Sequence, residues 1–289
     1  LSIRDMLKLI VCMKQVPKVS ELPWDARTGT LKRELAAGMM NPACKHALEA
    51  ALQLKHQWGG RITAVTMGPP AAREILHEAV AMGADGGVLL SDPRMAGADT
   101  DVTSFTLARA IEQTCPDFDL VLCGCYTTDS ETAQVGPQLA QELDVPGVAY
   151  VEHLEIDGRT LCMRREADDF LETLEMDLPG LVTITTRRYT PRYVSMSGLQ
   201  DAFGEVEIQT LDCDALGLDP VSVGMKASPT RIHKVYSAVA QKENVVLKGS
   251  PKKVVDALFE RFGDRIGAAL GKDLNPHEHA AVDGREDND

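Results

Sequence analysis

The chain has 289 residues, of which 44% are hydrophobic, and carries a formal net charge of −13 at pH 7. This length exceeds one domain of typical size but falls short of two large ones, so it predicts one main domain with an extension. The acidic balance argues against nucleic acid as a partner, because a phosphate backbone is bound by clustered lysine and arginine. No run approaches the roughly 20 apolar residues of a membrane-spanning helix, so we expect no membrane span.

The cysteines and histidines indicate a reduced protein without a metal centre. The seven cysteines are scattered, mostly within apolar runs, and form no C-x-x-C motif. This pattern is typical of reduced thiols, and we expect a cytoplasmic protein. The seven histidines form no ligand cluster, so no metal site is predicted. Residues 1–5 could be a leader before a start at Met6.

Four strand-and-helix units follow one another in the first half of the chain. The apolar runs typical of strands buried on both faces are 7–13, 61–67, 87–90 and 119–124. Helical patterns follow them at 42–55, 71–82, 100–114 and 132–142. Units in this succession predict a doubly wound α/β fold, in which helices cover both faces of a parallel sheet.

Residues that favour helix ends mark the boundaries of these helices. The expected N-caps are Asn41, either Asp99 or Thr100, and either Ser130 or Thr132. Pro42 suits the first helical position, and Gly83 is a natural C-cap. Residues 25–30 are consistent with a hairpin turn.

After Pro146 the pattern changes to short strands with tight turns. The expected strands are 147–156, 160–165, 170–176 and 181–186, which we interpret as antiparallel sheet added to one edge. We expect the α/β domain with this extension to span residues 6–203. Residues 204–271 are predicted to form a C-terminal arm that docks on a partner and includes an amphipathic helix at 251–270. Residues 272–289 form an acidic tail for which no stable fold is expected.

Polar and small residues follow each of the four predicted parallel strands, in the clusters 13–15, 67–69, 97–103 and 124–135. Doubly wound sheets bind ligands at the carboxyl ends of their strands. The polar loop at 125–131, followed by a helix start, would present backbone N–H groups to a phosphate. The composition of the clusters favours a nucleotide site over an ordinary turn between strand and helix.

The charged residues of these clusters leave their roles open. Lys14 is either a phosphate ligand or a surface charge. Asp99, Asp101, Asp129 and Glu131 either cap helices and interact with helix dipoles, or bind ribose hydroxyls. No catalytic residue is predicted, because the sequence lacks G-x-S-x-G, P-loop and G-x-G-x-x-G motifs.

Several strings in family order resemble the beta subunit of electron transfer flavoproteins across residues 6–203. They include VCMKQVP at 11–17, NP at 41–42, MGP at 67–69, AMGAD at 81–85, TAQVGP at 132–137 and PRY at 191–193. The resemblance implies an adenine nucleotide alpha hydrolase-like sheet, an alpha subunit as partner, and an adenine nucleotide in the predicted cleft.

The resemblance and the strand-end clusters together define the candidate cofactor-binding residues. They are Cys12, Lys14, Asn41, Pro42, Ala43, Cys44, Met67, Gly68, Pro69, Asp99, Thr100, Thr103, Gly124, Cys125, Tyr126, Asp129, Thr132, Ala133, Gln134 and Val135.

Two stretches bear on the identity of the nucleotide. The segment 97–103 resembles the Asp-Thr-x-x-Thr segment of electron-bifurcating members, and 132–135 is also similar to that type. The resemblance therefore favours FAD over the structural AMP of simpler members. It further implies NADH as electron donor, a flavin dehydrogenase as partner, and ferredoxin or flavodoxin as a low-potential acceptor.

Two departures from the family pattern are visible. Cys125 and Tyr126 replace the usual Lys-Gln pair, and Tyr126 could stack on the ligand instead. The loop that usually docks a dehydrogenase lacks its lysine-rich run, although Met196 and Leu199 remain as candidate docking residues. A nucleotide-binding regulatory module resembling universal stress proteins is the competing class, but such a module needs neither the antiparallel extension nor the arm.

Overall fold

The computed structural model describes residues 6–18, 24–25, 30–31, 37–204, 206–230 and 245–273. It divides into two compact units, Leu1–Ile232 and His233–Asp289, which are described separately below.

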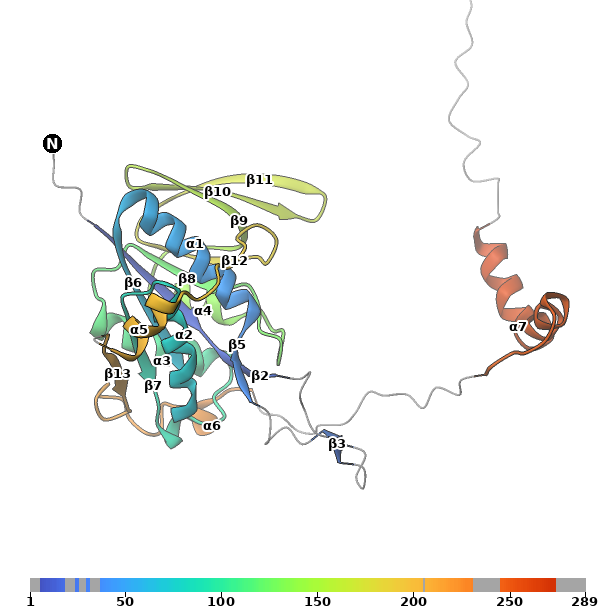
Figure 1. Ribbon diagram of the computed structural model, residues 1–289, viewed down its shortest axis with the longest axis horizontal. Helices are drawn as coiled ribbons and strands as arrows, with labels where there is room; N and C mark the ends of the chain where they lie inside the picture. The colour runs from blue at the N-terminus through green and yellow to red at the C-terminus, as the bar shows by residue number, and fades with distance from the viewer. Residues whose placement is uncertain are drawn as a thin grey trace, which may run out of the picture. The chain divides into compact units, whose positions relative to one another are not determined.

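The first unit is built on a nine-stranded sheet with the order β11-β10-β9-β12-β8-β1-β6-β7-β13 (Figure 1). Its strands are β1 (Leu7–Met13), β6 (Gly60–Met67), β7 (Gly86–Leu90), β8 (Leu120–Gly124), β9 (Gly147–Asp157), β10 (Thr160–Ala167), β11 (Phe170–Asp177), β12 (Gly180–Ile184) and β13 (Ile208–Leu211). In the part of the sheet with the order β9-β12-β8-β1-β6-β7-β13, all neighbouring strands pair in parallel. Within this sheet the pairings β9–β10 and β10–β11 are antiparallel. The predicted doubly wound α/β fold is confirmed.

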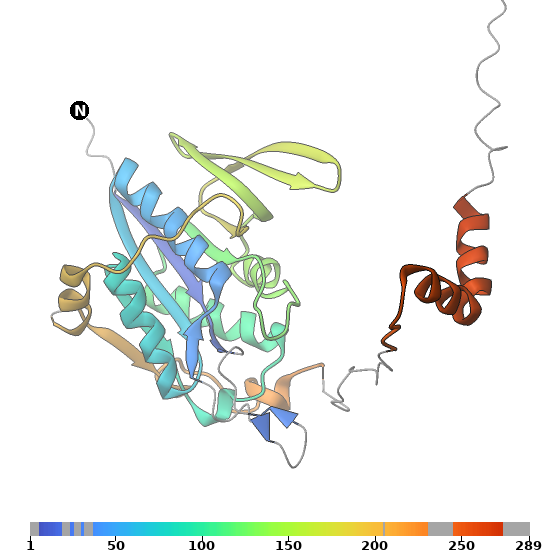
Figure 2. The same ribbon diagram turned by 45° about the vertical axis from the view of Figure 1, so that its right-hand side comes forward.

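Helices cover both faces of the sheet (Figures 1 and 2). The four that follow parallel strands are α1 (Pro42–Trp58), α2 (Arg73–Met82), α3 (Thr100–Thr114) and α4 (Val135–Glu142). Short 3-10 turns, η3 (Pro70–Ala72) and η4 (Pro93–Met95), precede α2 and α3.

Alternate residues of β1 point to two separate hydrophobic cores. Leu9 and Val11 join the core that includes residues of α1 and α2. Ile10 and Cys12 join the core that includes residues of α3 and α4. Each large side chain buried in this way contributes about 1.5–3 kcal/mol.

Two of the predicted helix caps, Asp99 and Gly83, are confirmed. Asp99 accepts a hydrogen bond from the backbone N–H of Val102 at 3.1 Å and caps α3 as expected. Gly83 ends α2 with a φ of 125°, a conformation that favours glycine. At Asn41 the backbone takes the N-cap position of α1, but the side chain does not cap the helix.

The predicted start of α4 was wrong. The helix begins at Val135 with Gln134 at the N-cap position, so neither Ser130 nor Thr132 caps it. The loop before it contains Ala133 with a φ of 56°, a left-handed conformation that interrupts the helical pattern.

The interpretation of 147–186 as wholly antiparallel was also wrong. β12 lies between β8 and β9 and pairs in parallel with both. All five residues of β12 are buried, as a central parallel strand requires. Only the pairings β9–β10 and β10–β11 are antiparallel, and they leave β11 at the edge of the sheet.

The first unit continues beyond the predicted boundary at residue 203. α5 (Met196–Phe203) packs beside α2, where Gly198 approaches the backbone of Ala81. β13 then pairs with β7 and extends the main sheet, and α6 (Gly224–Ala227) follows it.

In the second unit, the structure describes α7 (Pro251–Asp273), which covers the predicted amphipathic helix. Val255, Leu258 and Phe259 of this helix are exposed. Residues 274–289, and with them most of the predicted tail, lie outside the described residues.

Two small antiparallel pairs lie near the amino end of the chain. β2 (Gln15–Pro17) pairs with β5 (Gly38–Met40), and β3 (Trp24–Asp25) pairs with β4 (Thr30–Leu31). The turn predicted between β3 and β4 falls on residues 26–29, outside the described residues.

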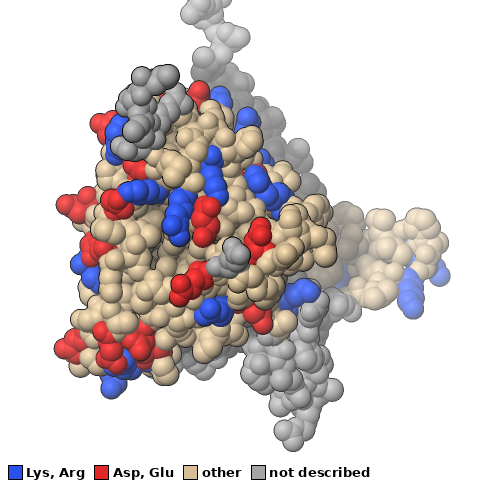
Figure 3. All heavy atoms as spheres, turned by 60° about the vertical axis from the view of Figure 1, so that its left-hand side comes forward, with Lys and Arg blue, Asp and Glu red and all other residues tan. Residues whose placement is uncertain are grey.

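The charge on the surface and the character of the helices are relevant to nucleic acids and membranes as partners. On the face shown in Figure 3, Lys and Arg side chains lie close to Asp and Glu side chains. Within the described part of the chain, no helix combines the length and the apolar character needed to cross a membrane.

Candidate functional site

The strand order reverses between β1 and β8. From β1 the chain moves to β6 and β7 on one side, and then returns to β8 on the other side. Ligands of open α/β sheets bind outside the carboxyl ends of the strands at this kind of point. The predicted clusters at 13–15, 67–69 and 124–135 all begin there, at the carboxyl ends of β1, β6 and β8.

Asn41 ties the loop after β8 to the start of α1. Its Nδ2 donates a hydrogen bond to the carbonyl oxygen of Tyr126 at 2.8 Å, and its Oδ1 accepts one from the N–H of Thr128 at 3.1 Å. The Asn41 side chain is fully buried. Because it satisfies two backbone groups of the loop, it fixes the loop against the helix, and this explains why it does not cap α1.

Gly124 allows α1 to approach β8 closely. A Cβ atom at this position would lie 2.7 Å from the carbonyl carbon of Ala43 and 2.8 Å from the backbone nitrogen of Cys44. No side chain fits into such a gap. Together, Asn41 and Gly124 bring the predicted segments 41–44 and 124–126 into direct contact.

The segment 131–135 combines left-handed and right-handed backbone conformations. Glu131 and Ala133 have φ values of 50° and 56°, and Gln134 returns to the right-handed helical region. Successive left- and right-handed residues form a concave group of N–H donors that binds anions. The N–H groups at 132–135 donate no hydrogen bond to another described residue. Left-handed alanine is also strained, a feature that clusters at functional sites.

The starts of α3 and α4 lie side by side. The hydroxyl of Thr100 and Oε1 of Gln134 are 3.2 Å apart, and the hydroxyl of Ser104 donates to the carbonyl oxygen of Val135. Two positive helix ends therefore meet at one point of the cleft. Thr103 lies in the first turn of α3, as predicted.

The Asp99 carboxylate accepts hydrogen bonds from two backbone N–H groups of the protein. Besides Val102, it accepts a hydrogen bond from the N–H of Thr230 at 2.8 Å. Burial works to raise the pKa of Asp99, but these backbone hydrogen bonds outweigh it and lower the pKa. Asp99 thus joins the start of α3 to the segment after α6.

Lys14 pairs with Asp129 across the cleft. The Lys14 Nζ lies 2.7 Å from Oδ2 of Asp129, and both side chains are partly exposed. Burial raises the pKa of Asp129, but the hydrogen bonds from Lys14 and Thr127 and the lysine charge lower it overall. The cation predicted for phosphate binding therefore has a carboxylate competitor within the same site.

The cysteines of the site are buried. Cys12 and Cys123 are paired residues of adjacent parallel strands. The hydrogen bond with Cys12 and burial raise the pKa of Cys123, and burial raises the pKa values of Cys44 and Cys125. High thiol pKa values make these side chains poor nucleophiles.

Two groups of predicted residues take no part in these contacts. After β6, the N–H of Gly68 donates to the carbonyl oxygen of Leu90, and Met67 packs against the core on the α3 and α4 side. Met196 and Leu199 are exposed on α5, which packs on α2 away from the contacts described above.

A cavity of about 370 Å³ beside Cys125 and Tyr126 was not predicted from the sequence. The residues that complete its lining are Tyr150, Glu152, Glu166, Asp168, Thr185, Thr186 and Arg187. The hydroxyl of Thr185 is buried without a hydrogen-bond partner among the described residues. Thr185 and Thr186 follow β12, so they form a fifth strand-end cluster, which the misplacement of β12 concealed. The buried apolar run of β12 was the signal that could have revealed it.

Comparison with known proteins agrees with this arrangement. A model of the family described as "Electron transfer flavoprotein domain" matches residues 28–216. The electron transfer flavoprotein subunit beta of Thermoanaerobacterium thermosaccharolyticum is 39% identical over 259 residues, covering 90% of this chain and 99% of that protein. The caffeyl-CoA reductase-Etf complex subunit CarD of Acetobacterium woodii is 41% identical over 261 residues, with 90% and 99% coverage. The acryloyl-CoA reductase electron transfer subunit gamma of Anaerotignum propionicum is 36% identical over 262 residues, with 89% and 98% coverage.

The family model covers the elements from α1 to β13, including the loop after β8. Proteins of this family are associated with flavins, and their beta subunits pair with alpha subunits. The chain belongs to the electron transfer flavoprotein family, as a beta subunit.

Proposed function

We propose that this beta subunit binds FAD in the cleft, receives electrons from NADH and distributes them by electron bifurcation. One route leads to the FAD of the alpha subunit and a dehydrogenase, and the other to a low-potential acceptor such as ferredoxin or flavodoxin. The observation that carries the proposal is the meeting of the α3 and α4 starts at Thr100 and Gln134, 3.2 Å apart.

The residues present fit a dinucleotide. The N–H groups at 132–135 have no partner among the described residues, and they lie at a helix start, where a diphosphate is favoured. Lys14 supplies a positive charge, provided that a phosphate displaces Asp129. The hydroxyls of Thr100 and Thr103 extend the polar lining of the cleft along α3. A dinucleotide would occupy this added length, whereas a mononucleotide would not require it.

The flavin, when bound, supplies both hydride acceptance and single-electron transfer, and the protein supplies binding, orientation and electrostatics. Asn41 holds the loop at 125–131 in position, so this side of the binding site is already formed before the ligand binds. Tyr126 offers an aromatic face beside the cavity at Thr185. A preorganised site of this kind binds without the cost of ordering a loop.

The names of two relatives support a reductase as partner. Relatives at 41% and 36% identity are named as subunits of caffeyl-CoA and acryloyl-CoA reductase systems. A non-bifurcating beta subunit with structural AMP is the second candidate, because the diphosphate donors and Lys14 would also hold one phosphate. The family match favours both over a regulatory module.

The test is the nucleotide content of the purified alpha–beta complex. After denaturation, the released flavin and adenine nucleotides are separated and quantified. We expect a second FAD per heterodimer beyond that of the alpha subunit, and bleaching of both flavins by NADH. One FAD with one AMP would refute the bifurcating function and leave the AMP-binding one.

A further inference from the structure

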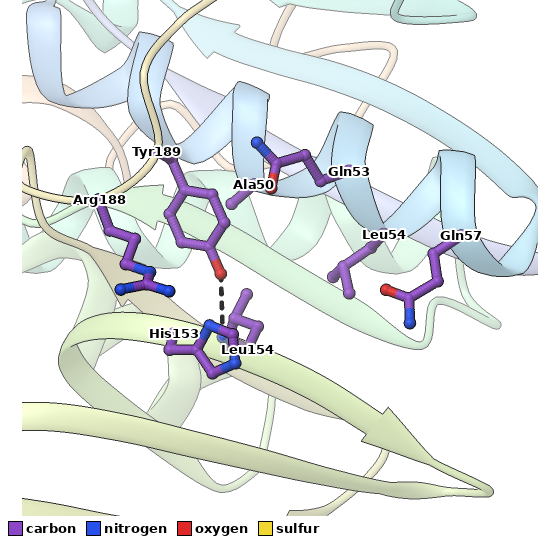
Figure 4. Close-up of a pocket in the computed structure, with 8 residues that line it drawn as sticks. All are labelled: Ala50, Gln53, Leu54, Gln57, His153, Leu154, Arg188 and Tyr189. Carbon is purple, nitrogen blue, oxygen red and sulfur yellow. Dashed lines mark hydrogen bonds between the residues drawn. The ribbon is translucent and has the colours of Figure 1, made fainter.

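A second cavity, of about 220 Å³, lies between α1 and β9, and its lining contains no carboxylate (Figure 4). It is lined by Ala50, Gln53, Leu54, Gln57, His153, Leu154, Arg188 and Tyr189. The lining carries Arg188 and no acidic residue, although the chain as a whole has 43 acidic and 30 basic residues. None of these residues belongs to the nucleotide cleft.

Arg188 brings an uncompensated charge to this cavity. Figure 4 shows Arg188 and Tyr189 reaching from the segment after β12 toward His153 of β9. Arg188 makes no hydrogen bond or ion pair with another described residue. Its neighbour Arg187, in contrast, pairs with Glu152 and Glu166. Arg188 is exposed at the edge of the cavity, and its guanidinium can bind a phosphate or carboxylate through two parallel hydrogen bonds, so it is available to an anion there.

A second arginine lies close to His153, although it does not line the cavity. Arg164 of β10 is the register partner of His153, and it also makes no ion pair with a described residue, whereas the adjacent Arg165 pairs with Glu172. Burial and then the charges of Arg164 and Arg188 lower the pKa of His153, while Glu155 opposes them weakly. The residues that α1 contributes to the lining carry no charge.

Tyr189 adds a neutral donor. Its hydroxyl oxygen accepts a hydrogen bond from the N–H of Leu154 at 2.9 Å, so its own proton is available to a ligand. Burial raises the pKa of Tyr189, which keeps that proton in place at neutral pH. Arginine, tyrosine and histidine donors around a cavity of this size suit a small oxyanion.

We propose that this cavity is a binding site for a small divalent oxyanion, a phosphate group, held by Arg188, Tyr189 and His153. The anion would compensate the two arginines and would favour protonation of His153. The site is independent of the identity of the nucleotide in the main cleft.

The test uses isothermal titration calorimetry of the intact alpha–beta complex with sulfate, which stays divalent between pH 6 and 8. We expect saturable binding that is tighter at pH 6 than at pH 8, because the anion raises the proton affinity of His153. Arg188→Met should weaken binding about tenfold or more, as expected for a lost charge-assisted hydrogen bond. Arg61→Met, which removes an exposed charge elsewhere in the same unit, should leave binding unchanged.

A His153 variant and a comparison of different anions test the role of the histidine and the identity of the ligand. His153→Gln should remove the pH dependence while the complex keeps its flavin content, which serves as the folding control. Acetate should bind at least tenfold more weakly than sulfate. Inorganic phosphate and ribose 5-phosphate are compared last: tighter binding of the ester supports a phosphorylated metabolite, and tighter binding of the free ion supports phosphate itself. Absence of saturable binding, or equal binding by Arg188→Met, would overturn the proposal.

Discussion

The contact between Gly124 and the start of α1 predicts a specific defect in Gly124→Ala. The new Cβ would lie 2.7 Å and 2.8 Å from backbone atoms of Ala43 and Cys44, well inside ordinary contact distance. Backbone atoms cannot rotate away, so α1 must shift outward by several tenths of an ångström. Overpacking of this kind costs about 1–3 kcal/mol.

The same shift should weaken nucleotide binding. Asn41 lies at the start of α1 and holds the loop after β8 through hydrogen bonds of 2.8 Å and 3.1 Å. An outward shift of α1 would lengthen both of these hydrogen bonds. For a unit of this size each kcal/mol lowers the melting temperature by about 2–4 °C, so we expect a loss of roughly 2–12 °C. Differential scanning fluorimetry of the alpha–beta complex, together with quantified nucleotide content, measures both effects.

A matched control is Gly86→Ala in β7. A Cβ there would meet only the side chain of Arg61, at 3.7 Å, which is ordinary contact. We expect little change in melting temperature or nucleotide content for this variant. If Gly124→Ala behaves like Gly86→Ala in both measurements, the argument that this contact positions the loop is refuted.

Three further predictions concern the same cleft. Asn41→Ala leaves the carbonyl of Tyr126 and the N–H of Thr128 without their partner, so stability should fall by about 1–3 kcal/mol in chemical denaturation, and unchanged stability would contradict the bridge. Thr132→Val combined with Gln134→Leu should lower nucleotide occupancy of the beta subunit, because it removes side-chain groups at the anion-binding segment and the contact to α3, and full occupancy would speak against that segment. Asp129 has a lowered pKa in the folded protein, so its pairing with Lys14 stabilises the protein above the unfolded pKa of about 3.9, and this contribution is lost as pH falls through the folded pKa. Lys14→Met should therefore flatten the acid limb of the stability profile below about pH 5, and an unaltered limb would exclude the contribution.

Much of the architecture follows from local patterns in the sequence. The apolar runs of β1, β6 and β8 and the helical patterns after them predict a parallel sheet, because such runs need cover on both faces. Asp99 and Gly83 mark helix ends as expected, since their capping depends only on neighbouring residues. The clusters that follow β1, β6 and β8 lie at the carboxyl ends of these strands, as their positions in the sequence predict.

Features that depend on distant contacts were not accessible in this way. The alternation of residues in a strand does not show which neighbour it pairs with, so β12 was placed in an antiparallel extension instead of beside β8. The Asn41 side chain prefers a loop 85 residues away over its own helix, a choice that no local rule contains. The left-handed backbone at Ala133 delays α4 for a similar reason, because residues around it favour a helix when considered alone.

The edge position of β11 has a consequence for storage and handling of the protein. An edge strand presents unpaired backbone groups to any other strand, and Phe170 and Leu171 at its start are exposed. Glu172 is paired with Arg165, but Glu175 on the same strand adds a negative charge to this rim, which would repel a second molecule approaching in the same way. The formal net charge of −13 adds to the repulsion between two molecules, and acid or high salt would weaken this repulsion.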